Sequence, residues 1–289
     1  MGLFRTASRG LIGLRTRLIG APAPRVAVVR LNGAIAAQDS AMRSHLSLNG
    51  LADSLHDAFD LPGVKAVALE INSPGGSPVQ SGLIVDRIRA LAEEKDVPVI
   101  AFAEDVAASG GYMLALAADE IFVHEASILG SIGVVAAGFG FHEAIARLGV
   151  ERRLYTAGDH KALLDSFRPE NPEDVSRLKD LQADIHAFFI QMVKDRRGRR
   201  LAGDEATLFN GDIFTGQRAV ELGLVDGIGD RRSVLRERFG KKVRFHPVNA
   251  RSRGLRGLFG ARSGAAGPNL PQQALATLES RLLWNRYGL

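Results

Sequence analysis

The sequence predicts an α/β protein built on a mainly parallel sheet. Short apolar segments rich in β-branched residues lie at 25–31, 64–71 and 97–102, and they alternate with segments whose apolar residues recur at helical spacing. Strands that alternate with helices are typical of right-handed βαβ units, which place successive strands in one parallel sheet. The 289 residues are enough for one large domain or two small ones.

The first half of the chain carries the clearest strand and helix patterns. The strand at 25–31 ends at Asn32-Gly33, and spaced Leu, Ala and Phe residues predict a helix over about 40–60. A second helix follows the strand at 64–71, because Ile84, Ile88 and Leu91 lie on one helical face.

The second half predicts shorter elements around one long helix. Residues 121–123 and 154–156 are expected to be short strands, and 141–148 a helix. Glu173–Lys194 is expected to be a long amphipathic helix, and a short helix is expected to end near Gly223.

Charge and composition divide the chain into three parts. A basic leader, 1–24, ends in the linker-like run Ala21-Pro22-Ala23-Pro24, a domain spans 25–248, and a basic linker and tail spans 249–289. Residues 1–25 contain five Arg and no acid, residues 26–150 have a net charge of −8, and residues 196–289 have a net charge of +10. The positive charge therefore lies away from the glycine-rich middle, which argues against a nucleic-acid partner and favours a membrane-surface or solubility role for the ends.

The leader and the compartment stay open at this stage. The sequence contains no run of 18 apolar residues, so no transmembrane helix is predicted. The leader is too polar for a signal peptide. It is either an amphipathic segment in peripheral contact with an anionic membrane or a disordered basic leader, so the protein is expected to be cytoplasmic or membrane-associated.

Several kinds of chemistry are excluded by composition and spacing. The chain has no cysteine, so it has no disulfide, thiol nucleophile or zinc–thiolate site. It has no Walker-type loop and no HExxH spacing, and we predict neither a cofactor nor a metal.

Two glycine motifs follow neighbouring strands of the predicted sheet. Asn72-Ser73-Pro74-Gly75-Gly76 comes after one strand, and Ala108-Ser109-Gly110-Gly111-Tyr112 after the next. The carboxyl ends of parallel strands meet at one edge of a sheet, so we expect the two motifs to lie close together. Ser109 then lies near a helix N-terminus, either as a capping residue or as a nucleophile beside unpaired N–H groups.

If Ser109 is a nucleophile, it requires an oxyanion hole and a base. The backbone N–H groups of Gly75 and Gly110 could stabilise an oxyanion. The histidines His124, His142 and His160 have no obvious orienting partner in the sequence. Lys161 lies in a segment of Ala and Leu that suits a neutral amine, since burial disfavours the charged form of lysine. From the residues alone, however, a solvated surface charge is the far more common role of a lysine.

The ordered motifs resemble those of one peptidase family. Asn72–Gly76, Ala108–Tyr112, Gly130-Ser131-Ile132-Gly133-Val134 and His160-Lys161 together are similar to the signal peptide peptidase A (SppA) family, peptidase family S49, of the ClpP/crotonase superfamily. The resemblance covers about residues 25–240. It implies that Ser109 is the nucleophile, Lys161 the general base, Gly75 and Gly110 the oxyanion hole, and Ser131 the residue that holds the lysine amine.

The resemblance also implies a fold, an assembly and a substrate. A half-length single-domain ClpP/crotonase-like fold is expected, in a homo-oligomer whose dyad is completed across subunits. The expected activity is a serine endopeptidase that cleaves signal-peptide remnants or other membrane-derived peptides, with apolar residues near Met113 and Ser131 favouring small or apolar side chains.

Two other functions remain open on the sequence. One is a crotonase-like enzyme acting on an acyl thioester, for which Glu104 or Asp105 would supply the base. The other is a non-catalytic ring-forming scaffold, although such a protein has no need of both Ser109 and Lys161.

Overall fold

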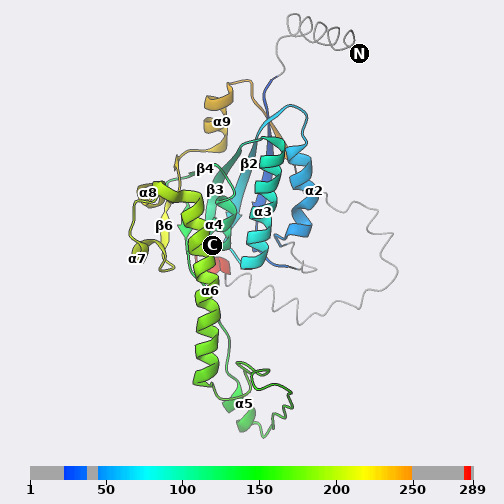
Figure 1. Cartoon of the computed structure of the whole chain (residues 1–289), viewed down its shortest axis with the longest axis vertical. Coiled ribbons are helices and arrows are strands. Elements are labelled where there is room, and N and C mark those ends of the chain that lie inside the picture. The colour runs from blue at the N-terminus through cyan, green and yellow to red at the C-terminus, as the bar shows by residue number, and fades with distance from the viewer. Residues whose placement is uncertain (1–22, 38–44, 249–282, 288–289) are drawn as a thin grey trace, which may run out of the picture.

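The computed structural model describes residues 23–37, 45–248 and 283–287, and within them the chain forms an α/β body with a projecting arm (Figure 1). The sheet order is β6-β5-β3-β2-β1-β8, with β4 pairing with β3 and β7. All pairs are parallel except β5 with β6. The predicted mainly parallel architecture is therefore confirmed. The strands are β1 (Arg25–Asn32), β2 (Val64–Ser73), β3 (Val99–Ala108), β4 (Glu120–Val123), β5 (Ile128–Gly130), β6 (Ile213–Thr215), β7 (Gly227–Ile228) and β8 (Arg244–Val248).

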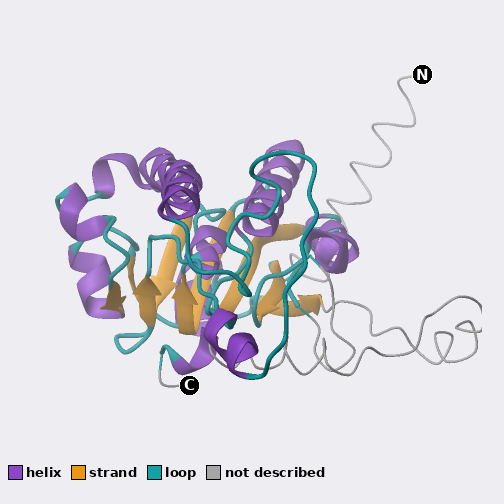
Figure 2. Ribbon diagram, turned by 90° about the horizontal axis from the view of Figure 1, so that it is seen from below, coloured by secondary structure: helices purple, strands orange, loops and turns teal. Residues whose placement is uncertain are grey.

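Helices cover both faces of this sheet (Figure 2). Residues of α2, α3, α4 and the end of α6 pack with one face in the larger core, whereas α9 packs on the other face through Leu235. The helices are α2 (Leu48–Phe59), α3 (Pro78–Lys95), α4 (Gly110–Ala115), α5 (His142–Arg147), α6 (Pro172–Arg197), α7 (Glu205–Leu208), α8 (Gly216–Glu221) and α9 (Arg231–Phe239), with a 3₁₀ turn at Gly198–Arg200.

The long helices begin at residues that the sequence marks clearly. Ser77 caps α3 by accepting a hydrogen bond from the N–H of Gln80, and Pro78 occupies the first turn. Asn171 caps α6 in the same way through the N–H of Glu173, before Pro172. These caps and prolines fix where each helix begins after its loop.

β3 is the strand that carries Ser109 to its position. β4 pairs with its first half at Ile100–Ala103, and β5 pairs with its second half at Val106–Ala108. The strand was expected to end near 102, but it continues to Ala108. The extension includes Glu104 and Asp105, whose side chains bind Arg30 and Asn72 instead of disrupting the strand.

The arm comprises residues 134–171, including α5, and it leaves the body before α6 returns to it (Figure 1). The strand expected at 154–156 does not form, and Tyr155 is 88% exposed. A strand needs a neighbour to accept its backbone hydrogen bonds, and on the arm this segment has no sheet edge beside it.

The remaining expectations from the sequence fall partly outside the described residues. The helix predicted over 40–60 appears as α2, which begins at Leu48, and residues 38–44 are not described. β1 begins at Arg25 and β8 ends at Val248. The predicted leader lies almost wholly, and the predicted tail mostly, outside the described residues, and the domain limits 25–248 stay a prediction.

Candidate active site

Ser109 occupies a strained turn between β3 and α4. Its φ and ψ are 51° and −124°, a conformation that non-glycine residues rarely adopt. Its N–H donates to the carbonyl of Gly130 at 2.9 Å, and its carbonyl accepts from the N–H of Tyr112 at 2.9 Å. The hydroxyl makes no capping hydrogen bond with the helix, so a capping role does not account for this serine. A sharp strand–serine–helix turn of this kind exposes the nucleophile of many hydrolases.

The two glycine motifs meet at this turn, as the sequence predicts. Ser73 pairs with Ala107 across β2 and β3, immediately before both loops. A Cβ on Gly75, whose φ is +98°, would lie 2.8 Å from both the backbone nitrogen of Gly110 and the Cβ of Ser109. Glycine at this position is therefore required for the loops to approach each other.

Backbone N–H groups at the turn are available to a ligand. Among the described residues, the N–H groups of Gly76 and Gly110 donate to no acceptor, whereas the N–H of Gly75 donates to Ser73 Oγ at 3.2 Å. The nitrogen of Gly76 lies 3.3 Å from the position that a Cβ on Gly110 would take. Donors beside a serine hydroxyl are the arrangement that stabilises an oxyanion in acyl transfer.

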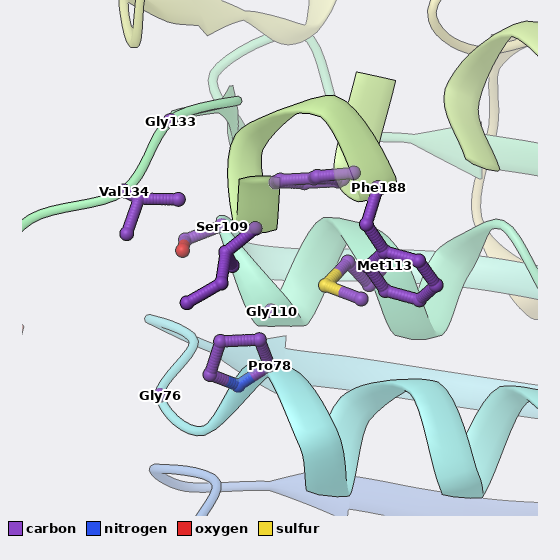
Figure 3. Close-up of a pocket in the computed structure, with 10 residues that line it drawn as sticks. Gly76, Pro78, Ser109, Gly110, Met113, Gly133, Val134 and Phe188 are labelled. Carbon is purple, nitrogen blue, oxygen red and sulfur yellow. The ribbon is translucent and has the colours of Figure 1, made fainter. Parts of the chain in front are cut away.

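A mostly apolar pocket opens beside Ser109 (Figure 3). Gly133 and Val134 lie on one side of Ser109, and Met113 and Phe188 lie on the other. Met113 is expected from the sequence, whereas the lining residues of α6 are not, although Ile185 and Phe188 stand at helical spacing on that helix. The lining residues are Gly76, Pro78, Ser109, Gly110, Met113, Gly133, Val134, Ile185, Phe188 and Phe189.

Ser131 lies next to the turn, but Lys161 does not. Ser131 is buried directly after β5, whose Gly130 carbonyl binds the Ser109 N–H, and the N–H of Ser131 donates to the carbonyl of Asp212 at 2.6 Å. Lys161 is exposed in a turn of the arm, where its N–H donates to the carbonyl of Gly158 at 3.2 Å, and it does not line the pocket. A single chain thus brings together Ser109, Gly75, Gly110 and Ser131 without Lys161.

The part of the chain that the structure describes shows no metal-binding cluster of His, Cys, Asp or Glu. Within the same residues, no helix combines the length and the apolar character needed to cross a bilayer.

A mainly parallel sheet that ends in a strained serine turn beside free N–H groups is typical of an acyl-transfer hydrolase. The family model for peptidase family S49 matches residues 91–242, and the chain belongs to this family. Membership in S49 agrees with the ClpP/crotonase-like fold that the sequence motifs imply.

The chain is also similar to individual proteins. The chain is 50% identical over 292 residues to a protein of Brucella abortus named as a Na(+)/H(+) antiporter, covering 96% of this chain and 39% of that protein. It is 36% identical over 165 residues to a putative protease of Synechocystis, covering 57% of this chain and 58% of the relative. The chain thus spans about two fifths to three fifths of the length of these relatives.

Among solved structures, one similar protein is a lysine-to-alanine mutant of the membrane-bound stomatin-specific protease 1510-N, in complex with a substrate peptide. The sequence identity is 14% and the TM-score 0.49, with 93% of this chain and all of the other covered.

Proposed function

We propose that the protein is a serine endopeptidase in which Ser109 attacks the peptide carbonyl and Lys161 of a neighbouring copy accepts the serine proton. The observation that carries the proposal is the strained turn at Ser109, whose hydroxyl makes no capping hydrogen bond with α4. Among the described residues, the N–H groups of Gly76 and Gly110 beside it donate to no acceptor. Membership in peptidase family S49 supports a peptide as the substrate.

The proposed reaction proceeds through an acyl-enzyme. Neutral Lys161 takes the proton of the Ser109 hydroxyl as Oγ bonds to the carbonyl carbon, and the resulting oxyanion accepts hydrogen bonds from backbone N–H groups. The lysine returns the proton to the leaving amine as the peptide bond breaks. Water then hydrolyses the ester by the same path and releases the new carboxyl group.

The proposed oxyanion hole consists of the N–H of Gly110 and the N–H of either Gly75 or Gly76. Gly110 presents a free N–H at the first position of α4. Gly75, which the sequence motif suggests, would have to release Ser73 Oγ before it could donate to substrate, whereas the N–H of Gly76 is already free and lines the pocket. Gly76 is therefore the better-prepared donor in this structure, and Gly75 is the alternative.

A neighbouring copy is needed because the arm carries Lys161 away from the body (Figure 1). The arm exposes large apolar side chains, with Phe139 at 75%, Leu148 at 77% and Tyr155 at 88% exposure. Exposed apolar surface of this extent is typical of a protein–protein interface, which supports a homo-oligomer. Burial in such an interface favours a neutral lysine amine, and Ser131 would accept a hydrogen bond from that amine.

The pocket suits apolar side chains of the substrate. Met113, Ile185 and Phe188 give it an apolar wall. Peptides released from membrane proteins, such as signal-peptide remnants, are rich in apolar residues, and we propose them as the substrate class.

Neither carboxylate that the sequence offers as a base for the acyl-thioester alternative is free. Glu104 forms an ion pair with Arg30 at 3.0 Å, and Asp105 accepts a hydrogen bond from Asn72 Nδ2 at 2.8 Å. Both acids are thus engaged in contacts within the sheet, which leaves the peptidase as the function that the geometry supports best.

The decisive experiment is complementation between two inactive variants. Ser109→Ala and Lys161→Ala should each abolish hydrolysis of an apolar fluorogenic peptide. Both should also lose labelling by a fluorophosphonate, because Ser109 attacks only when a base takes its proton. Co-expression of both variants in equal amounts should restore about a quarter of wild-type activity, because half of the serines and half of the adjacent lysines are intact in a randomly mixed ring.

The control is Lys179→Ala, which removes an exposed lysine of α6 instead of the lysine of the arm and should leave activity unchanged. No recovery on mixing, with both variants still assembled, would reject a dyad shared between copies. A wild type that is assembled but inert to probe and peptides would favour the scaffold.

A further inference from the structure

The end of α6 is firmly fixed to the helix that follows Ser109. Phe189 and Val193 of α6 are buried in the core. The guanidinium of Arg196 donates to the carbonyls of Leu116 at 2.7 Å and Ala118 at 2.9 Å, at the C-terminal end of α4. The beginning of α6 extends beyond the body towards the arm (Figure 1). Residues near the middle of α6 therefore lie where the body ends and the arm begins.

His186 makes a contact at this boundary that the catalytic proposal does not use. Its ring Nε2 lies 3.0 Å from the carbonyl oxygen of Ile132, and the side chain is half-buried. A carbonyl only accepts hydrogen bonds, so Nε2 carries the proton and donates it, as it does in both the Nε2–H tautomer and the imidazolium.

The segment held by His186 forms one wall of the pocket. Gly133 and Val134 follow Ile132 directly and lie beside Ser109 (Figure 3). Ile185 and Phe188, on either side of His186 in sequence, line the same pocket. The hydrogen bond thus joins two walls of the pocket. One wall is the segment Gly133–Val134, which leads into the arm, and the other is α6.

Few other bonds hold the departing chain. The N–H of Ser131 donates to Asp212, and the N–H of Gly133 donates to Ser131. Within the described residues, no hydrogen bond joins 134–140 to the body, and the next bond along the chain, from Phe141 to Ser166, lies within the arm. Among the described residues, the bond from His186 is therefore the last hydrogen bond that holds this segment before the arm leaves.

We propose that His186 is a positioning residue whose hydrogen bond to the carbonyl of Ile132, called the clasp below, holds Ile132 against α6. The clasp thereby sets the position of the pocket wall at Gly133–Val134 and the direction in which the arm leaves the body. Its consequence for catalysis rests on the proposed peptidase function, because Gly133 and Val134 line the pocket beside Ser109. The clasp itself is a property of the fold that can be measured without activity.

The test combines hydrogen–deuterium exchange with peptidase kinetics on the full-length protein. His186→Ala should raise amide exchange over 132–136 without raising it in α4. It should also raise KM for a peptide with an apolar residue before the cleaved bond by about three- to tenfold, with kcat changed less, as expected for the loss of one hydrogen bond. His186→Gln places an amide donor near the position of Nε2 and should restore both the exchange and the KM. The control, Asp184→Ala, changes an exposed residue of the same helix and should alter neither.

Wild-type exchange and KM in His186→Ala would overturn the proposal. So would a Gln variant that remains as impaired as the Ala variant, because the side chain would then act through packing. If the wild type hydrolyses no peptide, the exchange comparison still decides whether the clasp exists, and only the proposed function fails.

Discussion

Replacing Asp226 should destabilise the fold strongly, because this carboxylate neutralises a buried arginine. Its Oδ2 accepts from Arg197 Nη1 at 2.8 Å and from the N–H of Ile121 at 2.8 Å, and its Oδ1 accepts from Arg200 at 3.1 Å. The side chain of Arg197 is 2% exposed, whereas that of Arg200 is 46% exposed. Arg200 can be rehydrated when its partner is removed, but Arg197 cannot.

The magnitude follows from that difference in exposure. Removing one partner of a buried ion pair costs about 3–5 kcal/mol, while an exposed pair contributes about 0–1 kcal/mol. We therefore expect Asp226→Ala to lower the free energy of unfolding by about 3–5 kcal/mol. At about 2–4 °C per kcal/mol for a domain of this size, the Tm should fall by about 6–20 °C. Asp226→Asn keeps an acceptor for Ile121 and should lose less.

Urea denaturation of every variant at the same protein concentration measures this effect, because the mass-action contribution of an oligomer is then compared under equal conditions. The double variant Arg197→Met with Asp226→Leu should recover most of the loss, because it leaves no unpaired buried charge. A single variant within 1 kcal/mol of wild type, or a double variant no better than Asp226→Ala, would refute the reasoning.

The same carboxylate makes the free energy of unfolding depend on pH in the acid range. Burial raises the pKa of Asp226, but the hydrogen bonds from Arg197 and Ile121 and the charges of Arg197 and Arg200 outweigh burial and hold the pKa below its usual value. A lowered pKa in the folded state stabilises the fold at pH values above the unfolded pKa of about 4, and this contribution is lost as the pH falls below it. Asp226→Asn should therefore flatten the decline of stability between about pH 5 and 2.

Three further changes test other parts of the structure. Tyr112→Phe removes a fully buried hydroxyl that donates to the carbonyl of Leu224 at 2.6 Å, and should cost about 1–3 kcal/mol in urea denaturation. Gly76→Ala places a methyl group against the carbonyl of Ile35 at a φ of +143°, and should lower kcat/KM more than tenfold while the protein still assembles, because the loop beside Ser109 must shift. Arg238→Ala breaks an exposed ion pair and should change the free energy of unfolding by less than about 1 kcal/mol.

The serine side of the site could be predicted because sequence order fixes it. Ser73 and Ala107 end up as neighbours since β2 and β3 are consecutive parallel strands, and the loops after them must meet at one edge. The glycines at 75 and 110 then follow from the space available between the loops. Local pattern and topology therefore suffice to bring these loops together, but not to choose between Gly75 and Gly76 as the donor.

The rest could not be predicted because it depends on contacts far along the chain or beyond it. The pocket wall from Phe188 requires α6 to return across α4, and that path is set by polar contacts such as Arg196 with Leu116, which no periodicity reveals. The expected strand at 154–156 is wrong because strand propensity without a neighbouring edge produces no strand. Lys161 likewise lies outside the pocket of its own chain, which no local pattern indicates.

This division between body and arm predicts two separable kinds of defect. The body around Ser109 is held by buried polar links, of which Arg197 with Asp226 is one, so damage there should lower the free energy of unfolding. The arm leaves at the half-buried contact between His186 and Ile132, and its own side chains are largely exposed in the single chain. Damage at that contact should therefore alter KM and local exchange while leaving the unfolding midpoint nearly unchanged. If variants at Asp226 and His186 instead gave the same profile of lost stability and lost activity, body and arm would form one cooperative unit.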